Sequence, residues 1–359
     1  MSPRIFHYDW WLLGAIGFLL FASAITLLSI APGLFYKQLI WIGLAAIAIL
    51  GLPMLNLKAI FSYRWVILGL YLLSLISLLA VSVLGTRISG AKSWILLGDF
   101  QIQPSEFVKI AIIILFSAFF ASRHVSIKRY STIIASFVYF IIPGVLVLVQ
   151  PDLGTVLILF GIWFGYLLVS EIPFRYVLAM FAALAVIIAL AWSFGLQTYQ
   201  KERIIGLFKP DYDPLGINYS VIQSKIAIGS AGFFGKGFGQ GTQSQLGFLT
   251  AKSTDFAFAA FTEEWGLLGA FLIISAFLLM IYRILRVGLF SDNNFFKFVA
   301  LGTAIMMLMH FTINLGSDLG LFPVVGVSFP FLSYGGSNLL TLSILVGTIQ
   351  YAAKRRSGF

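Results

Sequence analysis

Asp255 is the acidic residue whose position most favours chemistry in this sequence. It follows the polar residues 252–254 and precedes the apolar residues 256–261, so it lies where a polar segment enters a hydrophobic one. A helix N-cap would explain it, because Asp is favoured at that position. A general base would explain it equally well, because partial removal from water raises the pKa of a carboxyl toward the range useful for proton abstraction. Both interpretations stay open at this point.

Glu106 and Lys109 place an acid and a base inside one apolar stretch of the chain. Their i, i+3 spacing makes them neighbours on one face of a helix. Charges inside an apolar helix are costly and usually pair toward the protein interior. We therefore predict a structural ion pair, which is compatible with a polar floor for a cavity.

A third acid, Asp152, follows Gln150-Pro151 and is explained more simply as the cap of the next helix than as a catalyst.

His310 and Asn314 form a polar pair at i, i+4 in another apolar stretch. Such a pair most often hydrogen-bonds to neighbouring helices. The sequence has no HExxH motif and no second His close to His310, so a zinc site is not expected and no metal ligand is assigned. It has no P-loop or Rossmann fingerprint either, and the glycines within 229–241 are interpreted as backbone freedom in a loop.

The elements that position these residues must be membrane helices. Of the 359 residues, 60% are hydrophobic and 10% are charged, whereas a soluble domain carries about 25% charged residues. Too few polar side chains remain to cover a water-facing surface, so the surface must face lipid. The chain has no cysteine, which excludes disulfides and thiolate metal sites. The first apolar run is too long for the hydrophobic part of a signal peptide and is interpreted as a retained span.

Apolar runs of about 20 residues predict ten membrane-spanning helices. The expected fold class is all-α, a polytopic membrane protein in which residues 1–359 form a single transmembrane domain. The fifth and sixth helices are separated only by residues 150–152, which predicts a tight hairpin. The predicted helices lie near residues 10–31, 38–56, 65–84, 104–121, 131–149, 153–170, 175–195, 257–286, 296–315 and 337–353.

The distribution of charge along the chain predicts its orientation. Ten helices put both termini on one side of the membrane. Of the 23 Lys and Arg residues, 13 fall on that side and 9 on the other, and an excess of positive charge in short loops marks the cytoplasmic face. The net charge of +10 therefore reflects topology, and nucleic acid is not an expected partner. Ten of the 13 acids lie outside or at membrane depth, which is where we expect the chemistry.

Several basic residues lie on the outer side, against the topology rule. They either extend to lipid phosphates or clamp an anionic, phosphate-bearing substrate. Arg suits bidentate phosphate contact better than Lys, but the sequence alone favours neither interpretation. The residues concerned are Arg87, Lys92, Arg203, Lys209 and Lys225.

Two regions outside the predicted helices are unusual. Residues 196–256 form a large extracellular loop between the seventh and eighth helices, and a loop of that length without a function of its own is uncommon. Residues 316–336 are apolar but interrupted by Gly and Pro. Irregular apolar backbone at membrane depth is tolerated only where protein or a cavity covers it. We interpret 316–336 as a re-entrant or interfacial segment.

Motifs at these positions resemble signatures of the SEDS family (shape, elongation, division, sporulation). They run from about residue 85 to 340 and fit the ten-span topology of that family. The sequence Pro-Val-Val-Gly-Val at 323–327 and the short N-terminal segment are more similar to the RodA branch of the family than to its FtsW branch. The sequence departs from the family motifs in two small ways, at Ser317-Asp318 and at Asn338. The motifs are Gln103-Pro104-Ser105-Glu106, Gln150-Pro151-Asp152-Leu153-Gly154-Thr155, Gly229-Ser230-Ala231-Gly232 leading to Asp255, and the stretch from Asn314 to Ser337.

The resemblance implies a peptidoglycan glycosyltransferase that polymerises lipid II during cell elongation and so controls cell shape. It implies a multi-pass protein of the bacterial cytoplasmic membrane, with both termini cytoplasmic. The essential acid of the family falls on Asp255, and its intramembrane Glu–Lys pair falls on Glu106 and Lys109. The implied partners are a class B penicillin-binding protein, which crosslinks the strand, and other membrane proteins of the elongation complex.

In the mechanism that we expect, Asp255 takes a proton from the acceptor sugar and the anomeric carbon of the donor is inverted. Arg203 and Lys209, or a divalent cation such as Mg²⁺ or Mn²⁺, would meet the charge of the leaving diphosphate. Glu106, Lys109 and Asp152 are the other expected substrate contacts. Two alternatives remain: a flippase for lipid II, which would need polar residues along a full path, and a scaffold that only activates its partner synthase.

Overall fold

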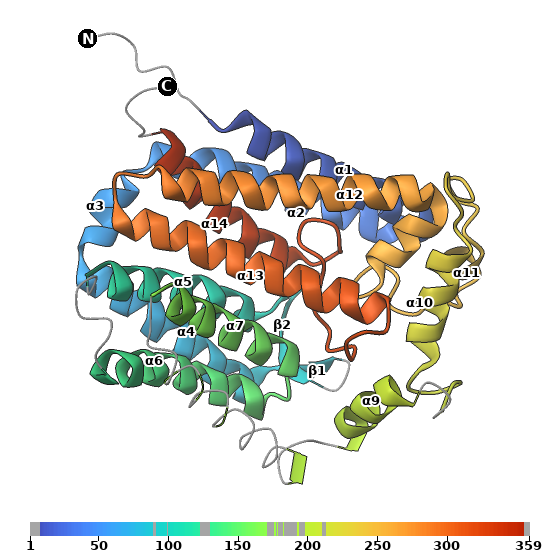
Figure 1. The fold of residues 1–359 in the computed structure, drawn as a ribbon, viewed down its shortest axis with the longest axis horizontal. Helices are drawn as coiled ribbons and strands as arrows, with labels where there is room; N and C mark the ends of the chain where they lie inside the picture. Colours follow the sequence, from blue (N-terminus) through green and yellow to red (C-terminus); the bar gives the residue numbers. More distant parts are fainter. Residues whose placement is uncertain are drawn as a thin grey trace.

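The apolar runs of the sequence form long helices that lie side by side along one direction (Figure 1). The computed structural model describes residues 8–88, 91–98, 100–122, 130–170, 176, 178, 182, 192–193, 198–209 and 213–354. The long helices are α1 (Trp10–Ile30), α2 (Pro32–Gly51), α4 (Arg64–Leu84), α5 (Pro104–Ser122), α6 (Tyr130–Val149), α7 (Leu153–Val169), α12 (Ala257–Leu289), α13 (Asn294–Asp318) and α14 (Gly336–Lys354). The shorter ones are η1 (Leu52–Met54), α3 (Leu57–Ser62), α9 (Thr198–Phe208), α10 (Tyr219–Gly229) and α11 (Thr242–Gln245).

The helices confirm a polytopic, helical membrane protein. Within the described part of the chain, seven helices are long and apolar enough to cross a membrane, and α7 is a shorter apolar helix. Each predicted span except 175–195 coincides with one of the long helices. Most of 175–195 lies outside the described residues, so the count of ten spans stays a prediction.

Polar contacts bring the start of α1 and the end of α14 together. The Asp9 backbone N–H donates to Oε1 of Gln350 at 2.9 Å, and the Asp9 carboxylate caps α1 by accepting from the amide of Leu12 at 3.0 Å. The same carboxylate pairs with Nη2 of Arg283 on α12 at 2.7 Å. We call this the inner end of the bundle. The opposite, outer end carries α9, α10 and α11 (Figure 1).

A small antiparallel sheet lies between α4 and α5, which an all-α prediction does not include. Its strands are β1 (Thr86–Ile88), β2 (Ala91–Leu97) and β3 (Phe100–Ile102), in the order β1-β2-β3. Strands β1 and β3 have three residues each, too few for a period-two pattern, and the seven residues of β2 do not alternate between apolar and polar. The sheet leads directly into α5, and the backbone N–H of Gln103 donates to Oγ of Ser337 at the start of α14, at 3.0 Å.

Glycines allow α7 to pack closely against α13. A Cβ at Gly161 would lie 2.7 Å from Met309, and one at Gly165 would lie 2.6 Å from Ile305. Small residues at such contacts are typical of helix pairs in membranes. At the outer end of α7, a Cβ at Gly154 would lie 2.5 Å from the carbonyl oxygen of Val325. The irregular stretch between α13 and α14 therefore rests directly on the first turn of α7.

Helix α12 is broken near its outer end, and the glycine-rich loop fills the break. Gly266 has φ 73° and ψ −174°, which is not helical. The loop amides of Lys236 and Gly237 donate to the carbonyls of Glu263 and Glu264 at 3.0 Å each. The first nine residues of α12, which begin two residues after Asp255, are thereby held at a fixed angle to the rest of the helix. The left-handed φ and the close backbone of the loop leave room only for glycine at 266.

We predict that Gly266→Ala destabilises the protein by about 2 kcal/mol or more, because it combines a strained φ with a backbone clash. Thermal unfolding in detergent would measure the effect. Gly14→Ala is the matched control, since a Cβ there has open space around it within a regular helix. Equal unfolding temperatures for the two variants would contradict the prediction.

Candidate active site

The outer half of the bundle encloses a cavity of about 1140 Å³. Six ionisable residues singled out in the sequence line it: Asp255, Glu106, Lys109, Asp152, Arg203 and His310. The wall formed by α6 and α7 is apolar, with Ile133, Phe137, Phe140, Ile141, Val145, Leu148, Val156, Leu157, Phe160 and Trp163. The cavity therefore has a charged end and a long apolar side.

The backbone around Asp255 is held by α13 and by the stretch that follows it. The side-chain amide of Asn314 donates to the carbonyls of Asp255 at 2.7 Å and of Val327 at 2.9 Å. The amide of Tyr334 donates to the carbonyl of Ser253 at 2.8 Å. The N-cap position of α12 is occupied by Phe256 and carries no side-chain capping bond. The N-cap interpretation of Asp255 is therefore wrong.

The environment of Asp255 suits a base. Burial raises the pKa of its carboxyl from 3.8 to about 6, and the nearby guanidinium of Arg203 and a hydrogen bond from Thr254 lower it by smaller amounts. Because the carboxyl lines the cavity, a substrate could reach it. Its proton affinity is close to that of a general base working near neutral pH.

Arg203 and Lys209, both predicted to bind substrate, differ in position. Arg203 on α9 lines the cavity, and its Nη1 donates to the carbonyl of Val324 at 2.7 Å. Lys209 follows the end of α9, is exposed, and is not among the residues that line the cavity. Six residues of helix separate the two by about 9 Å along the axis. Lys209 therefore does not line the cavity together with Arg203, and its role as a substrate contact stays a prediction.

The floor of the cavity is a buried polar cluster. Nζ of Lys109 lies 2.7 Å from Oε1 of Glu106, which confirms the predicted ion pair, and 3.1 Å from Nε2 of His310. Asn338 on α14 donates to Oε2 of Glu106 at 3.0 Å. Because an ammonium only donates, Nε2 of His310 accepts, and its Nδ1–H donates to the carbonyl of Ser328 at 3.1 Å. His310 is therefore a neutral imidazole in this arrangement.

Asp152 caps α7 and also faces the cavity. Its carboxylate accepts from the amide of Thr155 at 3.0 Å and from the Thr155 hydroxyl at 2.8 Å, which confirms the predicted cap. The side-chain amide of Gln103 donates to its second oxygen at 3.0 Å. Burial raises the pKa of the Asp152 carboxyl. Its role as a substrate contact stays a prediction.

Sequence reasoning missed some members of the site. Gln103 was visible only as part of a motif, and Asn338 only as a departure from one. His310 was expected to bond across helices, but its partner Lys109 was not identified. A pattern search along one helix does not find such pairs, because they join α5 to α13 and α14.

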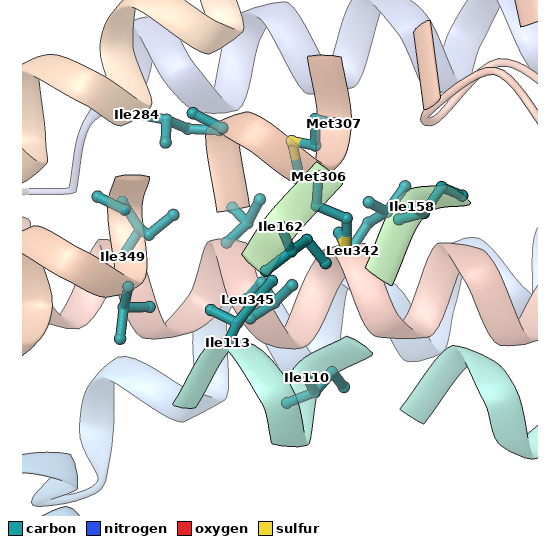
Figure 2. Close-up of a cluster of buried hydrophobic side chains, with 14 of the residues drawn as sticks. Ile110, Ile113, Ile158, Ile162, Ile284, Met306, Met307, Leu342, Leu345 and Ile349 are labelled. Carbon is teal, nitrogen blue, oxygen red and sulfur yellow. The ribbon is translucent and has the colours of Figure 1, made fainter. Parts of the chain in front are cut away.

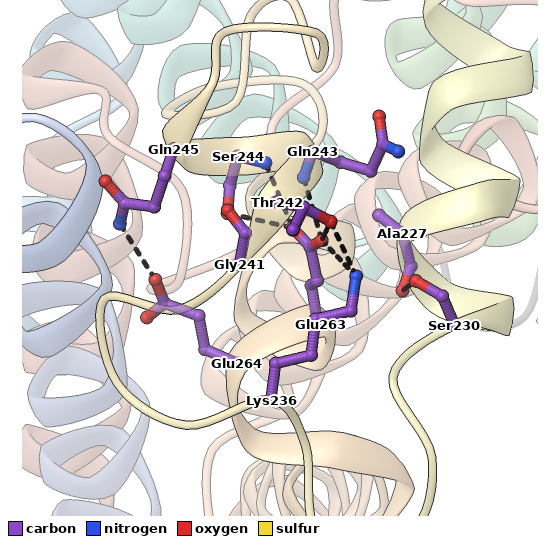
Figure 3. A network of polar contacts seen from close by, with 10 residues as sticks. All are labelled: Ala227, Ser230, Lys236, Gly241, Thr242, Gln243, Ser244, Gln245, Glu263 and Glu264. Carbon is purple, nitrogen blue, oxygen red and sulfur yellow. Dashed lines mark hydrogen bonds and ion pairs between the residues drawn. The ribbon is translucent and has the colours of Figure 1, made fainter.

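A second buried network anchors the outer loop beside the site (Figure 3). Glu263 is fully buried, and it pairs with Nζ of Lys236 at 2.8 Å and accepts from the amides of Gln243 and Ser244 at 2.8 and 3.0 Å. The adjacent Glu264 accepts from the side chain of Gln245 at 3.1 Å. The carboxylates thus hold the loop onto the first turns of α12. Neither acid belongs to a motif identified in the sequence.

Comparison with known proteins identifies the family. The FtsW/RodA/SpoVE model, described as a cell cycle protein, matches residues 4–358. The peptidoglycan glycosyltransferase MrdB of Escherichia coli K12 is 37% identical over 280 residues, which cover 78% of this chain and 75% of that one. MrdB of Helicobacter pylori 26695 is 36% identical over 346 residues, covering 93% and 85%.

Solved structures show the same fold. A chain of a peptidoglycan synthase complex that coordinates polymerization and crosslinking superposes with a TM-score of 0.83 at 29% identity, covering 98% of this chain and 100% of that one. The rod shape determining protein RodA of Thermus thermophilus superposes with a TM-score of 0.74 at 25% identity, covering 99% and 100%.

We predict that Lys109→Met destabilises the protein by about 3–5 kcal/mol, because it leaves Glu106 buried without a counter-charge. The double variant Glu106→Gln with Lys109→Met should recover much of the loss, since it removes both charges. Thermal unfolding of the two purified variants would measure the difference. A double variant no more stable than the single one would argue against the ion pair as the source of the effect.

Proposed function

The chain belongs to the FtsW/RodA/SpoVE family, the SEDS family that its motifs resemble, and on this premise we propose that it is a peptidoglycan glycosyltransferase of cell elongation. Relatives at 36–37% identity carry that activity in their names. We propose lipid II, a disaccharide peptide on undecaprenyl diphosphate, as the substrate. The observation that carries the proposal is a carboxyl with a raised pKa at the charged end of a cavity whose side wall is apolar.

The cavity suits an amphipathic substrate. Its volume of about 1140 Å³ exceeds the roughly 300–1,000 Å³ of most small-molecule sites. The apolar wall of α6 and α7 fits a polyprenyl chain, which has no groups to hydrogen-bond. The charged end, with Asp255 and Arg203, fits the diphosphate and the sugars. Such a division explains why a sugar transferase is built within a membrane.

Asp255 acts as the general base in this mechanism. It removes the proton of the 4-hydroxyl of the acceptor N-acetylglucosamine as that oxygen attacks C1 of the donor N-acetylmuramic acid. The bond from C1 to the phosphate oxygen breaks, and its electron pair leaves with undecaprenyl diphosphate. Attack from the opposite side inverts the configuration to β. A diphosphate leaves without protonation, so a single carboxyl is sufficient for proton transfer.

The charge of the leaving diphosphate needs a positive partner. Arg203 is placed for this role, since it lines the cavity and its charge acts on Asp255. The described residues contain no group of three or more His, Asp or Glu side chains arranged to hold a metal. The described part of the chain thus offers no metal site built from protein side chains alone. A Mg²⁺ or Mn²⁺ ion would need ligands from the diphosphate and from water.

Packing below the cavity opposes the flippase alternative. One helical turn inward of Lys109 and His310 lie Ile113 on α5 and Met306 on α13. Both belong to a cluster of buried apolar side chains that also includes residues of α7 and α14 (Figure 2). Ile113, Met306 and Leu345 in this cluster are 0% exposed. A headgroup passing to the inner end would have to cross this layer of closely packed apolar side chains. The cavity therefore suits a substrate that stays at the outer end.

We further propose that the inner end faces the cytoplasm, so that synthesis occurs on the outer face of the cytoplasmic membrane. A class B penicillin-binding protein and other elongation proteins are the proposed partners. The support is that a structural relative belongs to a complex of polymerization and crosslinking. A pure scaffold would share the fold but would not need a carboxyl at position 255.

The polymerisation rate should depend on pH through Asp255. The carboxyl accepts a proton only when it is ionised, so the rate should fall as the pH drops through about 6 and level off above it. Initial rates between about pH 5 and 8 would test this. A rate independent of pH over that range would contradict the role of Asp255.

Polymerisation of labelled lipid II by the purified protein with its penicillin-binding partner tests the function. A β-lactam would block the partner's transpeptidase, so that glycan length reports this chain alone. We predict that Asp255→Ala lowers the rate by about 10²–10⁴-fold, the range of general-base catalysis. Asp292→Asn, an exposed acid before α13 at the inner end, is the matched control. Full activity of a folded Asp255→Ala protein would favour the scaffold.

A further inference from the structure

Tyr334 lines the cavity and carries a hydroxyl that the mechanism above does not use. It lies in the irregular stretch between α13 and α14, two residues before α14 begins. Its side chain is partly buried, and its hydroxyl has no hydrogen-bond partner among the described residues. A tyrosine hydroxyl both donates and accepts hydrogen bonds, so this one is available to a ligand in the cavity.

The backbone fixes Tyr334 beside Asp255. The N–H of Tyr334 donates to the carbonyl of Ser253 at 2.8 Å, two residues before Asp255. The turn that precedes Tyr334 is closed at both ends of Phe329: its N–H donates to Oγ of Ser333 at 3.0 Å, and its carbonyl accepts from the N–H of Ser333 at 3.1 Å. Tyr334 and Asp255 are therefore held in one connected piece of backbone.

The turn at residues 329–333 is strained, and its packing maintains the strain. Phe331 has φ 61°, a left-handed value that is rare for a bulky residue. Its side chain is 2% exposed, and the buried ring of Phe329 stacks on Phe258 of α12 with centroids 5.9 Å apart. Strained backbone persists only where the surrounding contacts determine it, and it is concentrated at binding and catalytic sites. This turn presents Tyr334 to the cavity.

The cavity wall next to Tyr334 is aromatic and polar. The ring of Trp41 on α2 lies so close to Gly336 that no Cβ would fit there. Trp41 also lines the cavity, as do Gln101 on β3 and Trp94 on the neighbouring strand β2. None of these side chains carries a charge. They come from α2, the sheet and the start of α14, and together they form a neutral side of the cavity.

A sugar ring needs a surface of this kind. A pyranose presents C–H groups on its faces, which pack on aromatic rings, and hydroxyls at its rim, which exchange hydrogen bonds with neutral polar groups. A diphosphate needs positive charge instead, and Arg203 supplies it from α9. A tyrosine that only anchors the protein at the membrane surface would face lipid headgroups, whereas Tyr334 lines the cavity.

We propose that Tyr334 is a substrate-binding residue whose hydroxyl hydrogen-bonds to a sugar of the lipid-linked substrate and holds that sugar beside Asp255. The proposal rests on the proposed function and adds a sugar subsite to it. Trp41 and Trp94 form the aromatic side of the subsite. Tyr334 holds the sugar, Asp255 takes the proton and Arg203 meets the diphosphate, so no bond is made or broken at Tyr334.

Binding measured without turnover tests this subsite. The full chain carrying Asp255→Ala serves as the background, with and without Tyr334→Phe. The two probes are lipid II and undecaprenyl diphosphate, which has the same lipid and diphosphate but no sugar. We expect Tyr334→Phe to weaken lipid II binding by about 3- to 10-fold, the size of one hydrogen bond. Binding of undecaprenyl diphosphate should stay unchanged.

Two controls separate a contact with substrate from a structural role. The hydroxyl of Tyr334 has no partner among the described residues, so Tyr334→Phe should leave the unfolding temperature unchanged. A lower unfolding temperature together with weaker binding of both probes would assign the hydroxyl to the fold. Tyr282→Phe is the matched control, since Tyr282 is a tyrosine of α12 that is 56% exposed and does not line the cavity. It should change the affinity for neither probe.

Unchanged affinity of Tyr334→Phe for lipid II would overturn the proposal. An equal loss for the two probes would overturn it as well, because the effect would then not depend on the sugar. Polymerisation by the wild type with unchanged binding by Tyr334→Phe would leave the proposed function standing and remove the subsite alone. If the Asp255→Ala chain and the wild type bind neither probe, the proposed substrate is refuted, and the subsite with it.

Discussion

Backbone polar groups in a membrane protein must find partners within the protein, because lipid offers none. The region around Asp255 depends on this constraint. Where α12 breaks at Gly266, the glycine-rich loop supplies the missing donors, with Lys236 and Gly237 bonding to the carbonyls of Glu263 and Glu264. Where the chain runs irregularly between α13 and α14, Asn314 supplies two donors at once. Irregular segments are therefore fixed in place by one another.

That mutual support explains how a loop can hold Asp255, the proposed base, with precision. Asp255 lies between a loop anchored by the buried Glu263 and a helix whose side chain Asn314 bonds to its backbone. Both anchors are side chains that accept or donate several hydrogen bonds from a single position. A base held in this way needs less reorganisation when the acceptor hydroxyl arrives.

The distribution of charge along the bundle separates the layer proposed to bind substrate from the layer that closes the path through the membrane. Glu106 and Lys109 neutralise each other at the floor of the cavity, and one layer farther inward the side chains are apolar. The cost of burying the pair is offset by bonds from His310 and Asn338. Because the floor is neutral and the layer beneath it is apolar, the outer cavity can be polar without opening a path through the membrane.

The amino-acid sequence alone predicts the helices, because long apolar runs have few alternatives in lipid. It also predicts the Glu106–Lys109 pair and the Asp152 cap, since both depend on spacing within one element. Three findings come from the folded molecule: Asp255 is not a cap, Lys209 does not line the cavity, and the strands of 86–102 form a sheet. The partners His310, Asn338 and Glu263 were also set by the tertiary structure. Contacts between distant segments depend on how helices pack, and local periodicity carries no information about that.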